Sequence, residues 1–159
     1  MSKSKSFDPV LGRLPSGIFI LTIGTGARAT GMLASWVMQA GFEPPMVSMA
    51  VKLGRYVCDW VGEGQPFVLN LVGESQTNLL KHFGKGFEPG MPAFEGLSIS
   101  HCARGVPVLS DAIGHMECEP VRHVDSGDHR IFLAKIVRGK LLQPDAKPMI
   151  HIRKSGANY

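Results

Sequence analysis

Residues 31–45 read GMLASWVMQAGFEPP, a stretch that resembles a buried strand yet carries small and polar residues where a core needs bulk. Residues 17–23, rich in Ile and Phe, predict one strand, and residues 29–39 predict a second strand that returns from it as a hairpin. The Pro44-Pro45 pair should end the second strand, since proline cannot donate to a β-ladder. The small residues in this strand raise the question of what the missing bulk makes room for.

The side chains of residues 30–39 should alternate between two faces, as in any strand. One face would carry Met32, Ala34, Trp36 and Met38, and the other Gly31, Leu33, Ser35, Val37 and Gln39. The second face mixes small and polar residues with Leu33 and Val37, so a planar heteroaromatic ring could lie against its backbone with the Ser35 hydroxyl at the ring's edge. A barrel wall with one exposed face explains the same pattern, and both interpretations remain open at this point.

The rest of the sequence pattern predicts a mainly β fold. Further strands are expected over residues 46–52, 66–72, 98–103, 112–124, 129–142 and 149–153, with a turn at 126–128. Short helical segments are expected over 7–14, 55–62 and 75–83, the last with Ser75 as its N-cap, and an irregular loop over 85–97. Antiparallel strands with short inserted helices favour a closed or nearly closed β-barrel over a parallel α/β sheet. Neither a GxGxxG fingerprint before a helix nor a P-loop is present.

The length of 159 residues suits one domain, placed here at residues 14–159 behind an N-terminal extension of residues 1–13 whose tip should be disordered. The longest apolar run, residues 17–23, is too short to span a membrane, and no apolar segment follows the basic N-terminus as in a secretion signal. We therefore expect a cytoplasmic protein with no membrane partner. Three cysteines without paired spacing predict buried, reduced thiols: Cys58, Cys102 and Cys118.

Charge and spacing disfavour several kinds of site. The net charge of +4 is spread along the chain without interleaved aromatic residues, so an anionic small ligand is a better candidate partner than nucleic acid. The six histidines show neither HxxxH nor HExxH spacing, and we expect no metal site. Ser126, Asp128 and His129 fall at one predicted turn without a GxSxG context, so a hydrolase is not expected. His129 is then either a ligand contact or a residue of the turn.

Two cations, Lys52 and Arg55, flank the start of the helix expected over 55–62. Unpaired backbone N–H groups and the helix dipole favour an anion at such a position. A phosphate would fit there, although two solvated surface cations explain the same residues.

Several blocks of the sequence occur in the same order in a known family. These blocks are GMLASWVMQAGFEPP, AVKLGR, FVLNLV, LLKHFGKGFEPG, GVPVLSDA, MECEP, GDH and the closing PDAKPMIHIRKSGANY. Together they resemble the flavin reductase-like domain, an FMN-binding split barrel, and are most similar to the reductase domain at the C-terminal end of cyanobacterial diflavin flavoproteins. The resemblance covers the chain from about Leu14 to Tyr159. It implies that the small positions of the quoted stretch make room for an isoalloxazine ring.

The resemblance further implies a homodimer that binds FMN, or FAD, near the subunit interface and passes electrons from NAD(P)H to flavin. By match to the family motif, the ring would be lined by Ala34, Ser35, Trp36 and Val37, with Gln39 and the turn from Phe42 to Pro45 at its edge. The phosphate would be bound by Lys52 and Arg55, with Asn70 and His129 as further neighbours. Because flavin carries the hydride chemistry, no catalytic side chain is expected, with His129 as the one contributor to consider.

Two rivals stand beside an NAD(P)H-dependent flavin oxidoreductase. One is an FMN-binding electron-transfer or redox-sensing module without reductase turnover, and the other is a ligand-free interaction protein of the same fold. The di-iron and flavodoxin-like domains of the diflavin proteins are not in this sequence, so we expect either a free-standing reductase or a separate redox acceptor protein. Arg130 stands where related domains would carry an aromatic residue after Asp-His, which raises the hypothesis that it favours the extra phosphate of NADPH.

Overall fold

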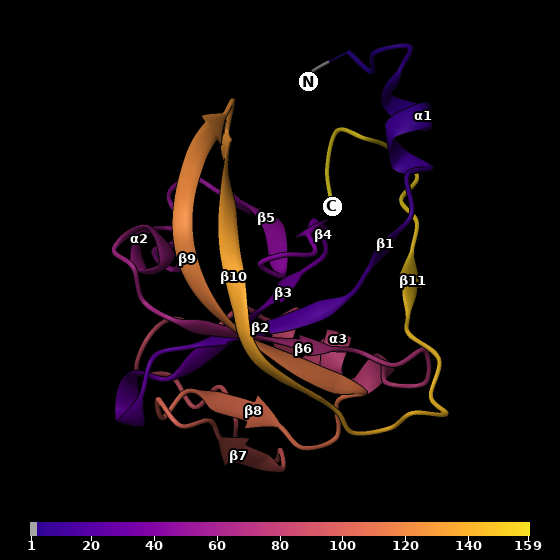
Figure 1. Cartoon of the computed structure of the whole chain (residues 1–159). Coiled ribbons are helices and arrows are strands. Elements are labelled where there is room, and N and C mark those ends of the chain that lie inside the picture. Colours follow the sequence, from indigo (N-terminus) through magenta and orange to yellow (C-terminus); the bar gives the residue numbers. More distant parts are fainter. Residues whose placement is uncertain (1–2) are drawn as a thin grey trace.

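The computed structural model describes residues 3–159, so Met1 and Ser2, the first residues of the expected disordered tip, lie outside it. Its centre is a seven-stranded antiparallel sheet in the order β3-β2-β6-β9-β10-β5-β4 (Figure 1). The strands are β1 (Ser16–Gly17), β2 (Phe19–Ile23), β3 (Thr30–Ala34), β4 (Val37–Gly41), β5 (Met46–Lys52), β6 (Phe67–Leu71), β7 (Ile99–His101), β8 (Pro107–Leu109), β9 (Gly114–Ser126), β10 (His129–Leu141) and β11 (Ile150–His151). The helices are α1 (Asp8–Gly12), α2 (Tyr56–Gly62) and α3 (Thr77–Phe83), with a 3-10 turn η1 (Gly26–Arg28). The expected mainly β, antiparallel fold with short inserted helices is confirmed.

The chain closes the sheet at Ser35 and Trp36. Strands β3 and β4 are the two edges of the seven-stranded sheet, yet only these two residues separate them along the chain. Three Cα-to-Cα steps span at most about 11 Å, so the sheet has to curl until its edges meet, which makes it a barrel. The single strand expected over 29–39 is therefore wrong, because β3 pairs with β2 whereas β4 pairs with β5.

Several other local assignments differ from expectation. Residues 17–23 form two strands, since β1 pairs with β11 whereas β2 pairs with β3 and β6. The short strand β8 is not predicted, because three residues are too few for an alternating pattern. Ser75 is not the N-cap of α3: the helix begins after Gln76, whose Oε1 accepts a hydrogen bond from the backbone N–H of Gly73 at 2.8 Å. By contrast, β5, α2 and the β9–β10 hairpin lie close to their predicted positions.

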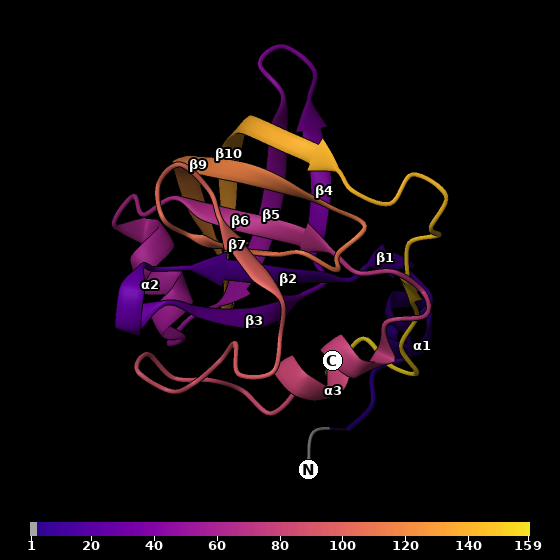
Figure 2. The ribbon, with the colours of Figure 1, turned by 90° about the horizontal axis from the view of Figure 1, so that it is seen from below.

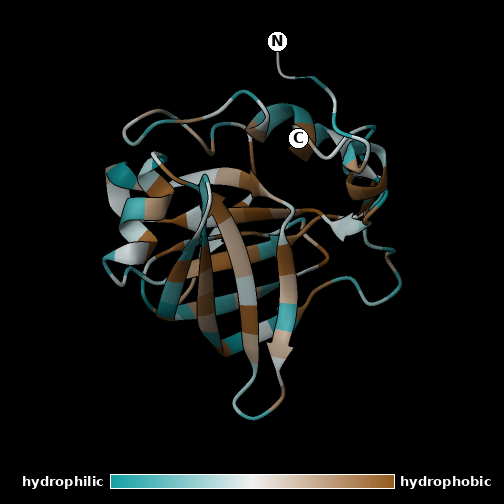
Figure 3. Cartoon of the chain, turned by 90° about the horizontal axis from the view of Figure 1, so that it is seen from above, coloured by the Kyte–Doolittle hydropathy of each residue, from teal (hydrophilic) through white to brown (hydrophobic). Residues whose placement is uncertain are grey.

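Two apolar clusters stabilise the barrel. One fills its interior and includes Leu21, Val47, Met49, Phe67, Leu69 and Phe132. The other packs α3 against the opposite face of the sheet and includes Ile20, Val72, Leu79, Phe83 and Leu109. Figure 3 shows hydrophobic and hydrophilic residues alternating along the strands, as expected for a sheet that turns one face to the interior.

The small size of Gly31 serves the packing of α3 on β3. A methyl group at this position would lie 2.9 Å from Cε1 of Phe83 and 3.3 Å from the backbone oxygen of Leu21. The interpretation that Gly31 leaves room for a ring is therefore wrong, because Phe83 fills that space. Ala34 is only 7% exposed and belongs to the interior cluster, so little of its side chain is left to contact a ligand.

Asn70 joins three segments of the fold from within. Its side chain is fully buried, and its amide nitrogen donates to the backbone oxygen of Ile20 at 2.9 Å and to the Thr22 hydroxyl at 3.2 Å. Its amide oxygen accepts a hydrogen bond from the backbone N–H of Leu109 at 2.9 Å. The one amide thereby links β6 to both β2 and β8, and we do not retain Asn70 as a candidate cofactor contact.

The cysteines are all free thiols. Cys58 and Cys118 are buried as expected, whereas Cys102 is partly exposed. Burial raises the pKa of the Cys118 thiol to about 12 and also raises the pKa of Cys58. Both buried groups therefore stay protonated at neutral pH, which makes them poor nucleophiles.

Within residues 3–159, no helix is both long enough and apolar enough to cross a membrane. In the same part of the chain, no group of three His, Cys, Asp or Glu side chains is arranged to hold a metal ion.

Replacing Asn70 with Ala should destabilise the fold by about 2–4 kcal/mol, because it removes the partners of two buried backbone groups and leaves a small void. Urea unfolding followed by circular dichroism would measure the loss. The matched control is Asn78→Ala on the exposed face of α3, which should change the free energy of unfolding by less than about 0.5 kcal/mol. Equal unfolding midpoints for the two variants would contradict the role assigned to Asn70.

Candidate functional site

Trp36, Lys52, Arg55 and His129, which are distant in sequence, meet at one end of the barrel. Trp36 precedes β4, Lys52 ends β5, Arg55 precedes α2, and His129 begins β10. His129 lies opposite Lys52 in the β5–β10 ladder, and its ring centroid is 4.7 Å from that of Trp36. We call this group of four residues the Trp36 site.

Two further residues, Arg153 and Tyr159, reach the Trp36 site from the C-terminal segment. The Arg153 guanidinium lies 5.3 Å from the centroid of the Trp36 ring, and the Tyr159 ring lies 5.2 Å from it. The Tyr159 hydroxyl also hydrogen-bonds Nε2 of His129. Sequence reasoning assigned neither residue a role. The only indication in the sequence was weak: both residues lie in PDAKPMIHIRKSGANY, the last block that resembles the family.

The joint between β3 and β4 leaves hydrogen-bond donors without partners. Within residues 3–159, no group accepts a hydrogen bond from the backbone N–H of Ser35 or of Trp36, and the Ser35 hydroxyl has no partner either. The carbonyl oxygen of Trp36 is engaged, since it accepts from the backbone N–H of Ala50 at 3.0 Å. Three donors are thus available within two half-buried residues to bond the polar edge of a flat ligand.

Positive charge dominates the surroundings of Trp36. Among the described residues, Lys52, Arg55 and Arg153 form no ion pair with a carboxylate, and Asp128 is the acidic residue that contacts the site. Burial raises the pKa of the Tyr159 phenol, and the charge of nearby Arg55 partly offsets that rise. Three cations without a salt bridge to any described carboxylate, set around an aromatic ring, suit a ligand that carries both an aromatic system and a phosphate. Because α2 has only seven residues, these side chains rather than the helix dipole would bind the anion.

Both ring nitrogens of His129 are engaged. Nδ1 lies 2.7 Å from an Asp128 carboxylate oxygen, and Nε2 is bonded to Tyr159. The hydrogen bond from His129 lowers the pKa of Asp128. Ser126 faces His129 in the β9–β10 ladder, but its hydroxyl makes no hydrogen bond to the ring. The arrangement of Ser126 and His129 thus gives no Ser–His nucleophile.

The remaining predicted cofactor contacts are dispersed along the β4–β5 hairpin. Ala34 and Val37 flank the joint, whereas Gln39 is exposed in β4 and donates to the backbone oxygen of Gly41 at 3.4 Å. Phe42 and Pro45 lie at the exposed tip of the hairpin, away from Trp36 along the strand. The chain therefore brings together only part of the predicted set at the Trp36 site.

Arg130 is committed to a partner across the β9–β10 hairpin. Its Nε and Nη2 atoms donate to the two carboxylate oxygens of Asp125, at 2.6 and 3.2 Å. This bidentate pair uses donors that a nucleotide phosphate would need. The geometry therefore gives the NADPH hypothesis for Arg130 no support.

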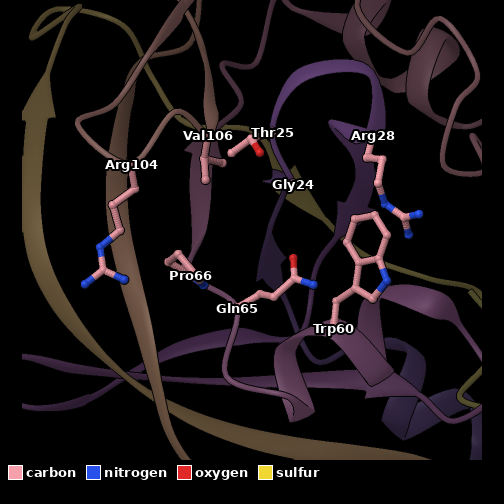
Figure 4. A pocket seen from close by; sticks show the side chains of 8 residues that line it. All are labelled: Gly24, Thr25, Arg28, Trp60, Gln65, Pro66, Arg104 and Val106. Carbon is pink, nitrogen blue, oxygen red and sulfur yellow. The ribbon is translucent and has the colours of Figure 1, made fainter.

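A separate hollow of about 400 Å³ lies between the β2–β3 turn, the end of α2 and the β7–β8 turn. Figure 4 shows its lining, in which Arg28 lies over the ring of Trp60, at 5.0 Å. Arg104 at its rim is paired with Glu119 at 2.6 Å. None of the residues expected to bind the cofactor lines this hollow, so it is distinct from the Trp36 site.

Comparison with known proteins identifies relatives over the whole chain. The family described as flavin reductase like domain matches residues 11–158. The chain is 39% identical over 153 residues to a diflavin flavoprotein of Thermosynechococcus vestitus, and 34% identical over 159 residues to diflavin flavoprotein A 1 of Synechocystis sp.. These alignments cover 96% and 99% of this chain but only 27% and 28% of the two relatives. The chain thus spans just over a quarter of their length.

A solved structure shares the fold. The NADH:FAD oxidoreductase SgcE6 of Streptomyces globisporus, in complex with NAD and FAD fragments, matches with a TM-score of 0.83 at 22% identity. The match covers 99% of this chain and 94% of that one.

Proposed function

Because this chain belongs to the flavin reductase-like domain family, we propose that it is an NAD(P)H-dependent flavin oxidoreductase that binds FMN at the Trp36 site. The observation that carries the proposal is the combination, around one corner of the barrel, of three donors at Ser35 and Trp36 with three cations; within residues 3–159 the donors have no hydrogen-bond partner and the cations no salt bridge. The free thiols support a cytoplasmic setting, where cysteines stay reduced.

The backbone donors suit the polar edge of an isoalloxazine ring. A flavin presents carbonyl oxygens and ring nitrogens along that edge, and hydrogen bonds to them bias its potential. The N–H groups of Ser35 and Trp36 are fixed by the short joint, so they need no reorganisation to bond such an edge. Flavin, when bound, supplies the hydride chemistry, and the chain's residues hold the ring and exclude competing solvent.

The cations suit the phosphate of FMN. Lys52 and Arg55 are exposed and close in sequence, and the backbone N–H of Arg55 lies 3.4 Å from the backbone oxygen of Lys52. An Arg guanidinium can bond a phosphate through two parallel donors, whereas Lys acts as a point charge. FAD would offer its diphosphate to the same cations, and its ring to the same donors.

A second candidate function is an FMN-binding electron-transfer or redox-sensing module without reductase turnover. The observation that favours it is that the matching region makes up only about a quarter of the diflavin relatives. In such a case the electron acceptor would be another protein or another part of a longer one.

The visible spectrum separates these functions. Purified protein mixed with FMN should retain flavin absorption bands after gel filtration, and the bands should bleach on anaerobic addition of NADH or NADPH. Bands that persist with both nucleotides would favour the module without turnover. A protein that does not retain FMN would contradict the flavin site altogether.

Removing either proposed phosphate ligand should weaken binding of FMN but not of riboflavin, which has no phosphate. We expect Lys52→Ala and Arg55→Ala each to raise the FMN dissociation constant by about 10-fold, the loss of one charge-assisted contact. Riboflavin binding should change by less than about 2-fold. The control is Lys140→Ala, an exposed cation at the opposite end of β10 from His129. If both flavins weakened equally, these cations would not be phosphate ligands.

The β4–β5 hairpin supports a homodimer as part of the proposal. It projects from the barrel (Figure 2), with Met38 in β4 71% exposed and Phe42 at its tip 88% exposed. Large exposed apolar side chains on a projecting hairpin are typical of an interface. From Trp36 to Phe42 the strand runs about 20 Å, too far for both to border one ring in the same copy. We propose that Phe42 and Pro45 border the ring held by the partner copy.

Light scattering at micromolar concentration should then give the mass of two chains. Phe42→Asp places a charge in the proposed interface and should shift the mass to that of one chain. The control is Phe7→Asp, which alters an exposed phenylalanine before α1 and should leave a dimer. A single-chain mass for the unaltered protein would contradict the dimer.

A further inference from the structure

Residues 153–159, here called the strap, are fastened to α1. Figure 1 shows the segment after β11 running beside α1 and then turning back toward the barrel. The backbone N–H of Arg153 donates to the oxygen of Gly12 at 2.8 Å, and that of Gly156 donates to the oxygen of Asp8 at 2.7 Å. A methyl group on Gly12 would lie 2.7 Å from the Arg153 oxygen. The contact therefore requires a glycine at position 12.

The fastened strap delivers two side chains to the Trp36 site. Arg153 lies over the Trp36 ring and donates to the backbone oxygen of Asn158 at 2.9 Å, which holds the strap in a compact shape. Tyr159 packs beside the same ring and bonds Nε2 of His129. Trp36 is thus enclosed by His129, Arg153 and Tyr159, from two distant parts of the sequence.

The two partners of His129 determine how its ring is held. The Asp128 carboxylate can only accept, so Nδ1 donates to it, and Nε2 shares a hydrogen bond with the Tyr159 hydroxyl. A histidine bonded at both nitrogens is fixed in orientation and in tautomer. Without Tyr159, the His129 ring would keep one hydrogen bond, to the exposed Asp128 carboxylate.

We propose that the strap is part of the flavin site, with Tyr159 as the positioning residue of His129, Arg153 as a third cation beside Trp36, and Gly12 as the remote anchor. This inference rests on the proposed function. It also extends the site to α1, which lies in the segment expected from sequence to be a mere extension.

Three variants separate the parts of the proposal. Tyr159→Phe removes the hydroxyl and keeps the ring beside Trp36. Gly12→Ala, at the last residue of α1, forces the strap from its anchor without altering any residue of the Trp36 site. Its matched control is Gly62→Ala at the last residue of α2, where a methyl group would meet only the flexible end of Arg130, at 3.4 Å.

Two readouts need no flavin. In a Trp60→Phe background, acrylamide quenching of the remaining fluorescence reports how far Trp36 is covered, and ¹⁵N NMR of the imidazole reports the partners of His129. We expect Gly12→Ala to increase quenching and Tyr159→Phe to shift the Nε2 resonance with quenching unchanged. Gly62→Ala should match the parent in both. Unchanged quenching in Gly12→Ala, with the fold intact by circular dichroism, would overturn the anchoring.

The third readout is the FMN dissociation constant. Loss of the Tyr159 hydrogen bond should raise it by about 2- to 10-fold, and Gly12→Ala should raise it at least as much. Wild-type affinity in both variants would show that the strap lies outside the site, and tighter binding would show that it covers the site against ligands. Either result overturns the proposal. If the parent protein itself bound no FMN, the proposed function would fail, while fluorescence and NMR would still decide whether Tyr159 holds His129.

Discussion

The two-residue joint between β3 and β4 is the constraint on which the rest of the structure depends. It connects the opposite edges of a seven-stranded sheet, and so requires the sheet to close. The same joint interrupts both ladders, which removes the acceptors that Ser35 and Trp36 would otherwise meet. Closure of the barrel and creation of the proposed binding corner are therefore one event, and the site lies where the fold can least accommodate an insertion.

The elements that could be predicted from sequence are those whose pattern is local. The side chains of strand β5 alternate between buried and less buried over seven residues, and a short polar turn connects β9 to β10. Both features can be predicted without knowing which strands pair with them. The break at Ser35 was not predictable, because apolar alternation continues across it in the sequence while the pairing partner changes from β2 to β5. Strand β8 could not be predicted either. It has only three residues, and its position depends on contacts with residues far away in the chain, including Asn70.

The resemblance assigned Trp36, Lys52, Arg55 and His129 to one site, and the structure brings these four residues together, while their contact with flavin stays a prediction. Asn70 shows the limit of that reasoning, because a polar residue in a strand looks the same in sequence whether it meets a ligand or a buried backbone group. Gly31 shows the same ambiguity for small residues, because a glycine in the sequence is equally compatible with a helix side chain or a ligand packed against it. Arg153 and Tyr159 could not be placed, because the path of the strap depends on α1.

Barrel closure by so short a joint has a consequence for how the chain folds. Hairpins such as β2–β3 and β9–β10 can form from neighbouring residues, but β6 has to enter between β2 and β9, and β5 has to find β10 across a long stretch of chain. Topologies dominated by such distant pairings fold in milliseconds to seconds rather than microseconds. The ladders on both sides of Ser35 and Trp36 must be in register before the edges can meet. The folding barrier should thus be set by long loop closures, and the corner proposed for flavin should be among the last parts to take shape.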